Sequence, residues 1–219
     1  MLASRTRRSA AAWLLPLAAA AGFATMWLGY RQGWGWLATV DSSALSTGYD
    51  IGVKHPGWVR FWDAVCTVLA PVTFRLLGVA AAGFALLQNR VRTALLVLIS
   101  VEFSGLVAQA VKNLADRPRP ATALATASSS SFPSGHAVGV MVGVAALLTV
   151  FLPVLSRPAR LAAVALGVLM VVTVGLGRVA LNVHHPSDVL AGWALGYLYF
   201  AVCAGLVAAK PRRRPHRLD

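Results

Sequence analysis

The amino-acid sequence predicts an all-α fold, an integral membrane bundle of six transmembrane helices. The chain has 219 residues, of which 58% are hydrophobic and only 12% are charged. Ordinary soluble domains hold about 45–50% apolar and about 25% charged residues, so a soluble chain of this length has no place for so much apolar surface. The apolar residues also fall into stretches of about 20, the length that crosses a bilayer. Lys and Arg residues stand at the ends of these stretches, as in membrane proteins with positively charged cytoplasmic loops.

Six stretches are long and apolar enough to be spans. In chain order they cover residues 10–30, 61–87, 93–111, 136–155, 161–177 and 189–209. The first follows Arg5, Arg7 and Arg8 as a signal peptide would, but it is longer than a signal core of about 7–15 residues, so we expect an uncleaved anchor. The second is interrupted by Arg75, which can snorkel, pair within the bundle or mark a break between two shorter segments.

No internal repeat or low-complexity segment divides the chain. We therefore expect a single domain over residues 1–219. The polar segment after the first span is expected to be a loop along the outer interface, because Trp34, Trp36, Trp58 and Trp62 border it and such rings prefer the headgroup level. Residues 210–219 form a basic tail that we expect to be solvated.

The distribution of positive charge predicts the topology. If the N-terminus is inside, the cytoplasmic segments hold 12 of the 20 Lys and Arg residues and the outer segments hold seven. This bias predicts that both termini are cytoplasmic, which an even number of spans permits. The net charge of +13 does not indicate nucleic-acid binding, because the chain has no basic stripe with interleaved aromatic residues. Cys66 and Cys203 lie in apolar segments and are expected to be buried free thiols.

Three polar clusters interrupt the apolar sequence, and all three fall on the predicted outer side. They are KNLADRPRP at residues 112–120, SFPSGH at residues 131–136 and GRVALNVHHPSD at residues 177–188. If the helix ends converge, Lys112, Arg119 and Arg178 come together with few acids nearby. Clustered cations in a membrane protein need a counterion, and a phosphate dianion would supply it, since arginine binds phosphate oxygens in a bidentate manner.

The second cluster adds uncharged donors to this predicted anion site. It directly precedes the fourth span, so the first backbone N–H groups of that helix and the positive end of its dipole are free to face an anion. Gly135 permits close approach of the backbone, and Ser134 supplies a hydroxyl donor. The sequence therefore predicts a preorganised phosphate-binding site.

Two histidines and a carboxylate complete a set suited to phosphoryl transfer. His184 precedes Asp188 by four residues, so the carboxylate can hold one ring nitrogen and leave the other as a nucleophile. His136 comes from another helix and could protonate the leaving oxygen. A metal site formed by His136, His184, His185 and Asp188 is the alternative, but a divalent ion would add charge to an already positive pocket. We therefore expect neither a metal nor a cofactor; His55 and His216 are expected to be ordinary surface residues.

At these residues the sequence resembles the type 2 phosphatidic acid phosphatase superfamily, which also includes the vanadium haloperoxidases. Its pattern is Lys-x6-Arg-Pro, then Pro-Ser-Gly-His, then Ser-Arg-x5-His-x3-Asp. The matching residues are Lys112, Arg119, Pro120, Pro133, Ser134, Gly135, His136, Arg178, His184 and Asp188. The spacing selects His184 over His185, and Gly177 stands where the family usually has serine.

The resemblance implies a metal-independent phosphatase with a phosphohistidine intermediate at His184, Asp188 as its orienter and His136 as the leaving-group acid. It also implies that Lys112, Arg119, Ser134, Gly135 and Arg178 bind the phosphoryl oxygens. Because the site lies at helix ends near the headgroups, we expect a lipid phosphate or diphosphate as substrate: phosphatidic acid, phosphatidylglycerophosphate or a polyprenyl compound. A phosphotransferase, a non-catalytic anion-binding transporter and a degenerate structural member are the alternatives.

Three further residues carry weaker expectations. Glu102, in the middle of the third span, is expected to form a hydrogen bond to a neighbouring helix inside the bundle. Asp116 and Arg117 flank the predicted phosphate site and are expected to contact the headgroup of the substrate.

Overall fold

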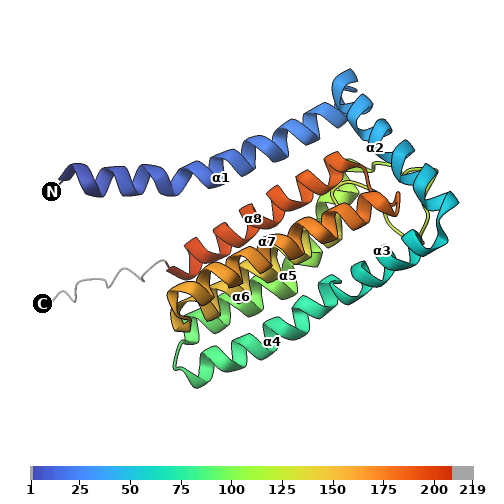
Figure 1. Ribbon diagram of the computed structural model, residues 1–219. Coiled ribbons are helices and arrows are strands. Elements are labelled where there is room, and N and C mark those ends of the chain that lie inside the picture. The colour runs from blue at the N-terminus through green and yellow to red at the C-terminus, as the bar shows by residue number, and fades with distance from the viewer. Residues whose placement is uncertain (1, 209–219) are drawn as a thin grey trace, which may run out of the picture.

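The computed structural model describes residues 2–208, with side chains from residue 13 onward. The basic tail at 210–219, with His216, and the side chains of Arg5, Arg7 and Arg8 lie outside the described residues. The part of the chain that is described is helical and contains no strand. Its elements are α1 (Leu2–Arg31), α2 (Gly35–Lys54), α3 (Pro56–Val68), α4 (Pro71–Leu87), α5 (Val91–Ala115), α6 (Gly135–Phe151), the 3₁₀ turn η1 (Leu152–Val154), α7 (Arg157–Ala180) and α8 (Pro186–Ala208) (Figure 1).

Six segments are long and apolar enough to cross a membrane, which confirms the predicted bundle of six spans. They are Trp13–Arg31, Pro56–Leu87, Val91–Ala115, Gly135–Val154, Arg157–Ala180 and Pro186–Ala208. Many large apolar side chains on their outer faces are exposed, as is expected of helices that face lipid rather than water.

The second span consists of two helices, α3 and α4, and the interruption lies at Pro71 rather than at Arg75. Pro71 opens α4 because a proline lacks the N–H that would continue the hydrogen bonding of α3. Arg75 lies one turn further on, half-buried, with its guanidinium against Gly105 of α5. Glu102 lies on the exposed face of α5, so the expected position inside the bundle is wrong.

The predicted outer loop is in fact the helix α2, which lies across one end of the bundle and links α1 to α3 (Figure 1). One face of α2 is buried, and its members recur every three or four residues, as on one side of a helix. They are Leu37, Asp41, Leu45, Gly48 and Gly52. The loop between α7 and α8 fixes this face, because Asn182 Nδ2 donates to the Leu45 carbonyl at 2.9 Å.

Helix α6 is the centre of the bundle and packs against α4, α5, α7 and α8. Its buried valines, among them Val138 and Val142, form the largest apolar cluster with residues of α4 and α5. The crossing of α6 and α8 is very close at Gly192, where a Cβ would stand 2.7 Å from the Ala137 Cβ and 2.8 Å from the Ser134 carbonyl oxygen. Small residues at such a crossing let two membrane helices approach backbone to backbone.

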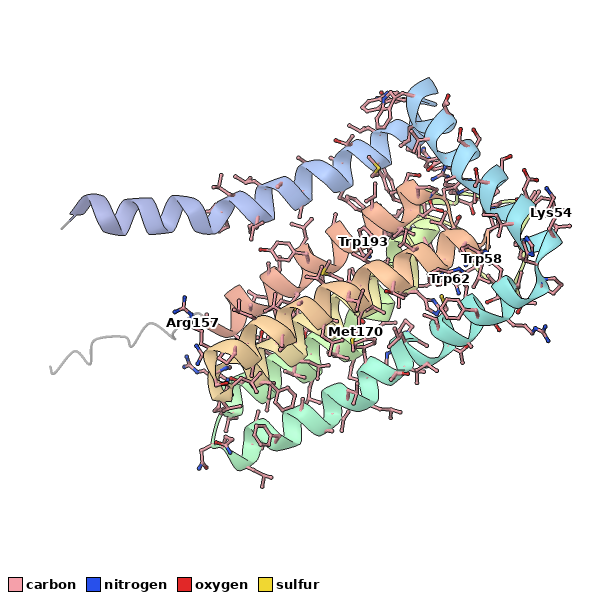
Figure 2. All side chains as sticks on the ribbon, viewed as in Figure 1. Lys54, Trp58, Trp62, Arg157, Met170 and Trp193 are labelled. Carbon is pink, nitrogen blue, oxygen red and sulfur yellow. The ribbon has the colours of Figure 1, made fainter. Side chains whose placement is uncertain are left out.

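This packing brings four helix ends together beneath α2. The C-terminal ends of α5 and α7 and the N-terminal ends of α6 and α8 meet there, and each carries part of one of the polar clusters. Figure 2 shows Lys54, Trp58 and Trp62 toward this end of the molecule, with Arg157 at the opposite end and Met170 between them. The polar site therefore lies at one membrane boundary.

Candidate active site

The three polar clusters meet around a cavity of about 460 Å³. It is lined by six of the eight predicted site residues: Lys112, Arg119, Gly135, His136, Arg178 and His184. The remaining walls come from the α3–α4 region and from residues 126–129. Of the two neighbouring histidines, it is His184 that faces the cavity, as the spacing predicted.

The imidazole of His184 is almost completely buried and has a distinct neighbour at each nitrogen. Nε2 lies 3.2 Å from Arg119 Nη1. Because a guanidinium only donates, Nε2 is assigned as the acceptor and Nδ1 as the protonated nitrogen. Nδ1 faces Asp188 Oδ2 at 3.6 Å, which is longer than a hydrogen bond. The tautomer therefore places the lone pair on the cavity side.

Burial lowers the pKa of His184 to about 4, because an apolar surrounding disfavours the charged imidazolium. The carboxylate of Asp188 acts in the opposite direction, and the guanidinium groups of Arg178 and Arg119 lower the pKa further. His184 is consequently a neutral base at physiological pH, the form in which its nitrogen can attack phosphorus.

Asp188 lies behind His184, out of the cavity, and is fully buried. Its Oδ1 accepts from Arg117 Nη1 at 2.7 Å. Its Oδ2 accepts from Ser131 Oγ at 2.5 Å, from the backbone N–H of His185 at 2.8 Å and from the His185 ring, whose Nδ1 lies at 3.1 Å. A carboxylate with this many donors is fixed in orientation and favours the ionised form.

The cations of the site are held mainly by backbone carbonyl groups, which leaves their charge available. Lys112 Nζ donates to the carbonyl of Ser130. Arg119 Nε donates to the Ser129 carbonyl at 2.7 Å, and its Nη1 donates to the Val183 carbonyl at 2.6 Å. Burial and the neighbouring guanidinium of Arg178 lower the pKa of Arg119. Positive charge is thus concentrated at the cavity.

Arg178 carries an unused donor. Its side chain is buried, and its Nε has no hydrogen-bond partner among residues 13–208. Buried donors in proteins are nearly always paired, so an isolated guanidinium N–H beside a cavity indicates a ligand that accepts hydrogen bonds.

Ser134 and Gly135 open α6 at the edge of the cavity. The Ser134 oxygen accepts from the backbone N–H of Ala137 at 3.5 Å as the N-cap, and its backbone N–H donates to the Asp188 carbonyl at 2.9 Å. The Ser134 side chain is completely buried and does not line the cavity in this structure. The neighbouring Gly135 and His136 do, so the helix N-terminus itself faces the site.

Arg117 is buried between two carboxylates and is not placed to contact a headgroup, contrary to the expectation from the sequence. Its side chain is buried, its Nη2 pairs with Asp41 Oδ2 at 2.8 Å and its Nη1 pairs with Asp188. The sequence-based reasoning missed Asp41, Ser131 and Ser187 as members of the site. Ser131 belongs to the polar cluster at residues 131–136 and could have been proposed. Asp41 lies in α2, 76 residues before Arg117, and no motif around it indicates a role in the site.

The glycine that departs from the expected family pattern has a structural explanation. A Cβ at Gly177 would stand 2.7 Å from Cys66 Sγ and 2.9 Å from the ring of Trp62, so α3 fills the space of a side chain there. Cys66 also lines the cavity. Both cysteines are free and buried, as predicted. Among residues 13–208, no three His, Cys, Asp or Glu side chains converge as metal ligands would.

Fold and site together define a multi-pass membrane protein with a positively charged pocket built around a buried histidine. Comparison with known families agrees: the sequence pattern of the PAP2 superfamily matches residues 93–212. The chain belongs to this superfamily. The matched segment contains all three polar clusters.

Named relatives are lipid phosphatases. The chain is 38% identical over 115 residues to phosphatidylglycerophosphatase B of Bacillus subtilis, a match that covers 51% of this chain and 56% of the relative. It is 29% identical over 180 residues to lipid A 1-phosphatase of Rhizobium johnstonii, covering 72% and 69% respectively. The first match thus spans little more than half of that relative.

A solved structure extends the likeness to the whole fold. The crystal structure of a transmembrane PAP2 type phosphatidylglycerolphosphate phosphatase from Bacillus subtilis superposes with a TM-score of 0.75 at 25% identity. The superposition covers 91% of this chain and 98% of that chain. The similarity therefore includes the helices that precede the matched family segment.

Proposed function

We propose that this protein is a metal-independent membrane phosphatase that hydrolyses a lipid phosphomonoester or diphosphate through a phosphohistidine at His184. One observation carries the proposal: the neutral Nε2 of His184 faces a cavity lined by Lys112, Arg119 and Arg178. Cations alone would serve an anion-binding transporter as well. A buried histidine with a fixed carboxylate behind it is the arrangement of a nucleophile or a general base, which a transporter does not need.

In the first step, the phosphoryl group binds among the three cations and the N-terminus of α6. The anion takes over donors of Arg119, and this releases Nε2. The Nε2 lone pair then forms a bond to phosphorus while the bond from phosphorus to the ester or bridging oxygen breaks. His136 takes up a proton when the phosphate dianion offsets the surrounding guanidinium charge, and it gives this proton to the leaving oxygen. Asp188 stabilises the positive charge that develops on the ring of His184.

In the second step, water attacks the phosphorus of phosphohistidine. His136, now neutral, accepts a proton from the water, and the bond between Nε2 and phosphorus breaks. Inorganic phosphate leaves, His136 releases this proton, and Arg119 returns to Nε2. Each group is regenerated in its starting protonation state.

The preference for a lipid is supported by the place of the cavity and by the relatives. Its wall includes Val72 of α4, whose side chain is 57% exposed on the outside of the bundle, so the cavity reaches the lipid-facing surface. The relatives are named for phosphatidylglycerophosphate, lipid A and decaprenylphosphoryl substrates. We expect an acyl or prenyl chain to remain in the bilayer while its phosphate occupies the site on the non-cytoplasmic side.

The test is phosphate release by purified protein in detergent with excess chelator. The panel holds short-chain phosphatidic acid, phosphatidylglycerophosphate and farnesyl diphosphate. We expect activity to survive the chelator and His184→Ala to lower kcat by about a thousandfold or more, because the nucleophile is lost. His55→Ala, at the exposed junction of α2 and α3, is the control and should match the wild type.

Two results would overturn the proposal: full activity in His184→Ala, or loss of activity with the chelator. Alkaline quenching during turnover should also trap labelled phosphate on the protein, and this label should be absent from His184→Ala. Transfer of the label to an added lipid alcohol in place of water would identify a phosphotransferase.

A further inference from the structure

Asp41 is the one member of the buried network that comes from α2. Its side chain is 2% exposed. The other buried residues of α2 are leucines and glycines, so Asp41 is the one charged residue that this helix buries. Its Oδ1 accepts from the backbone N–H of Ser187 at 3.0 Å. Its Oδ2 accepts from Ser187 Oγ at 2.6 Å and from Arg117 Nη2 at 2.8 Å. All of these contacts are made to the catalytic end of the bundle.

Arg117 joins Asp41 to Asp188. Its two terminal nitrogens are divided between the two carboxylates, at 2.8 Å and 2.7 Å, and Nη1 also donates to Ser187 Oγ at 2.7 Å. The guanidinium lies over the ring of Tyr30, 4.7 Å from its centre. A buried arginine fixed in this manner cannot swing toward either partner, so its place between the acids is set.

Asp41, Arg117 and Asp188 together carry two negative charges and one positive charge. Arg117 and Asp188 alone would form a neutral pair, and the guanidinium would draw the carboxylate charge away from His184. With Asp41 included, two carboxylates share one cation and the group keeps a net negative charge. Part of that charge lies on Asp188, 3.6 Å from Nδ1 of His184, where positive charge develops when Nε2 bonds to phosphorus.

We propose that Asp41 is a positioning residue of the active site: through Arg117 it fixes Asp188 and keeps the negative charge of that carboxylate available to His184. The inference rests on the phosphohistidine mechanism proposed above. Asp41 lies outside the segment 93–212 that the family pattern matches. A helix that precedes the family segment therefore takes part in the chemistry.

The test is a double-mutant cycle in the full chain. The variants are Asp41→Asn, Arg117→Gln and the double variant Asp41→Asn/Arg117→Gln. The substrate is short-chain phosphatidic acid or farnesyl diphosphate, whichever the wild type turns over faster. Asp50→Asn is the matched control, because Asp50 is exposed on the same helix.

We expect Asp41→Asn to lower kcat about 10- to 100-fold, the usual effect of losing a partner behind a catalytic ligand, with a smaller change in KM. Alkaline-quench labelling should show that formation of phosphohistidine is the slowed step. The double variant should be more active than either single variant, since it leaves Asp188 as the sole charge and restores the net charge of the group. A purely structural network would instead lower the melting temperature and the yield of folded protein, and would leave kcat per folded molecule unchanged.

The inference is overturned if Asp41→Asn keeps kcat within about twofold of the wild type, or if the double variant is no more active than the single variants. Should Asp41→Asn fail to purify as a monodisperse protein, the comparison of the double variant with Arg117→Gln decides in the same manner. These outcomes are separate from failure of the proposed function, which would appear as retained activity in His184→Ala.

Discussion

At the scale of single residues, the site works by giving each group a different environment. His184 is enclosed by protein and positive charge, and its pKa falls to about 4. Asp188, four residues later, receives donors from Arg117, Ser131 and His185. The same short segment of chain therefore holds a base that stays neutral and an acid that stays ionised.

This difference predicts the pH dependence of the enzyme. Because the folded-state pKa of His184 is lowered, the neutral nucleophile is present above about pH 4 and is lost as the pH falls through that value. We expect the part of the kcat/KM profile that His184 controls to fall near pH 4, not near the ordinary histidine value of about 6.5. The measurement is kcat/KM from pH 3.5 to 8 in detergent, corrected for ionisation of the substrate. If the acidic limb of the kcat/KM profile lay at pH 6.5 and was due to His184, the imidazole ring would be solvated and this prediction would be wrong.

The sequence predicted those site residues that lie close together in the chain and form short motifs. The distance of four between His184 and Asp188, and the order of the three clusters, predicted six of the residues that line the cavity, His184 among them. Asp41 was not predictable, because it pairs with residues 76 and 146 positions away and its own helix gives no polar pattern. Arg117 was misplaced for the same reason, since its partners were not visible in the sequence.

At the scale of the helices, the crossing of α6 and α8 determines the geometry of the site. Gly192 and Gly196 let α8 approach α6, where a Cβ at Gly196 would stand 2.8 Å from the Val138 carbonyl oxygen. This approach allows the backbone N–H of Ser134 to reach the Asp188 carbonyl. The start of α6, which faces the cavity, is thereby joined to the start of α8, which carries Asp188.

We expect Gly192→Val to separate these two helix starts. Overpacking a tight contact commonly costs about 1–3 kcal/mol, and here the obstacle includes backbone. The melting temperature in detergent should fall, and kcat should fall with it, because Asp188 and Gly135 move apart. Gly205→Val is the control, since a Cβ at Gly205 meets nothing within 4 Å on the same helix. Equal behaviour of the two variants would contradict this account of the crossing.

The spans themselves were predictable and α2 was not. A stretch of about 20 apolar residues in a bilayer has to be helical, because only a helix satisfies its backbone within lipid. Residues 35–54 mix Gly, Ser, Thr and Asp with apolar residues, which is typical of a loop. They form a helix because a buried face packs on the catalytic end of the bundle and Asn182 binds its backbone. These contacts join residues that are far apart in the chain, so the sequence of α2 alone does not indicate them.

At the scale of the whole molecule, the distribution of charge and aromatic rings gives the bundle two unlike ends. Lys54, Trp58 and Trp62 lie toward the end that holds the site, and Arg157 lies at the other (Figure 2). By sequence, 12 of the 20 Lys and Arg residues fall in the segments predicted to be cytoplasmic, and Arg157, at the end opposite the site (Figure 2), belongs to one of these segments. We therefore propose that the cavity faces the non-cytoplasmic side.

Cysteine labelling in whole cells checks this orientation. Gly57 is exposed at the start of α3 with nothing within 4 Å, and Ser156 is exposed at the start of α7, where its side chain makes no capping hydrogen bond. A membrane-impermeant maleimide should label Gly57→Cys in intact cells and Ser156→Cys only after permeabilisation. The native cysteines are buried and provide a low background. The reverse pattern would place the site in the cytoplasm.

The hydrogen bond from Arg119 to His184 bears on chemoselectivity. The site lies close to the glycerol esters of the surrounding lipids, which are uncharged electrophiles at high local concentration. In the mechanism proposed here, the guanidinium of Arg119 engages the Nε2 lone pair of His184 before a substrate binds, so an acyl ester would not meet a free nucleophile. A phosphate dianion would compete for the guanidinium of Arg119 and so release the Nε2 lone pair of His184. We therefore expect the enzyme to react with charged phosphates and not with the acyl esters of the surrounding bilayer.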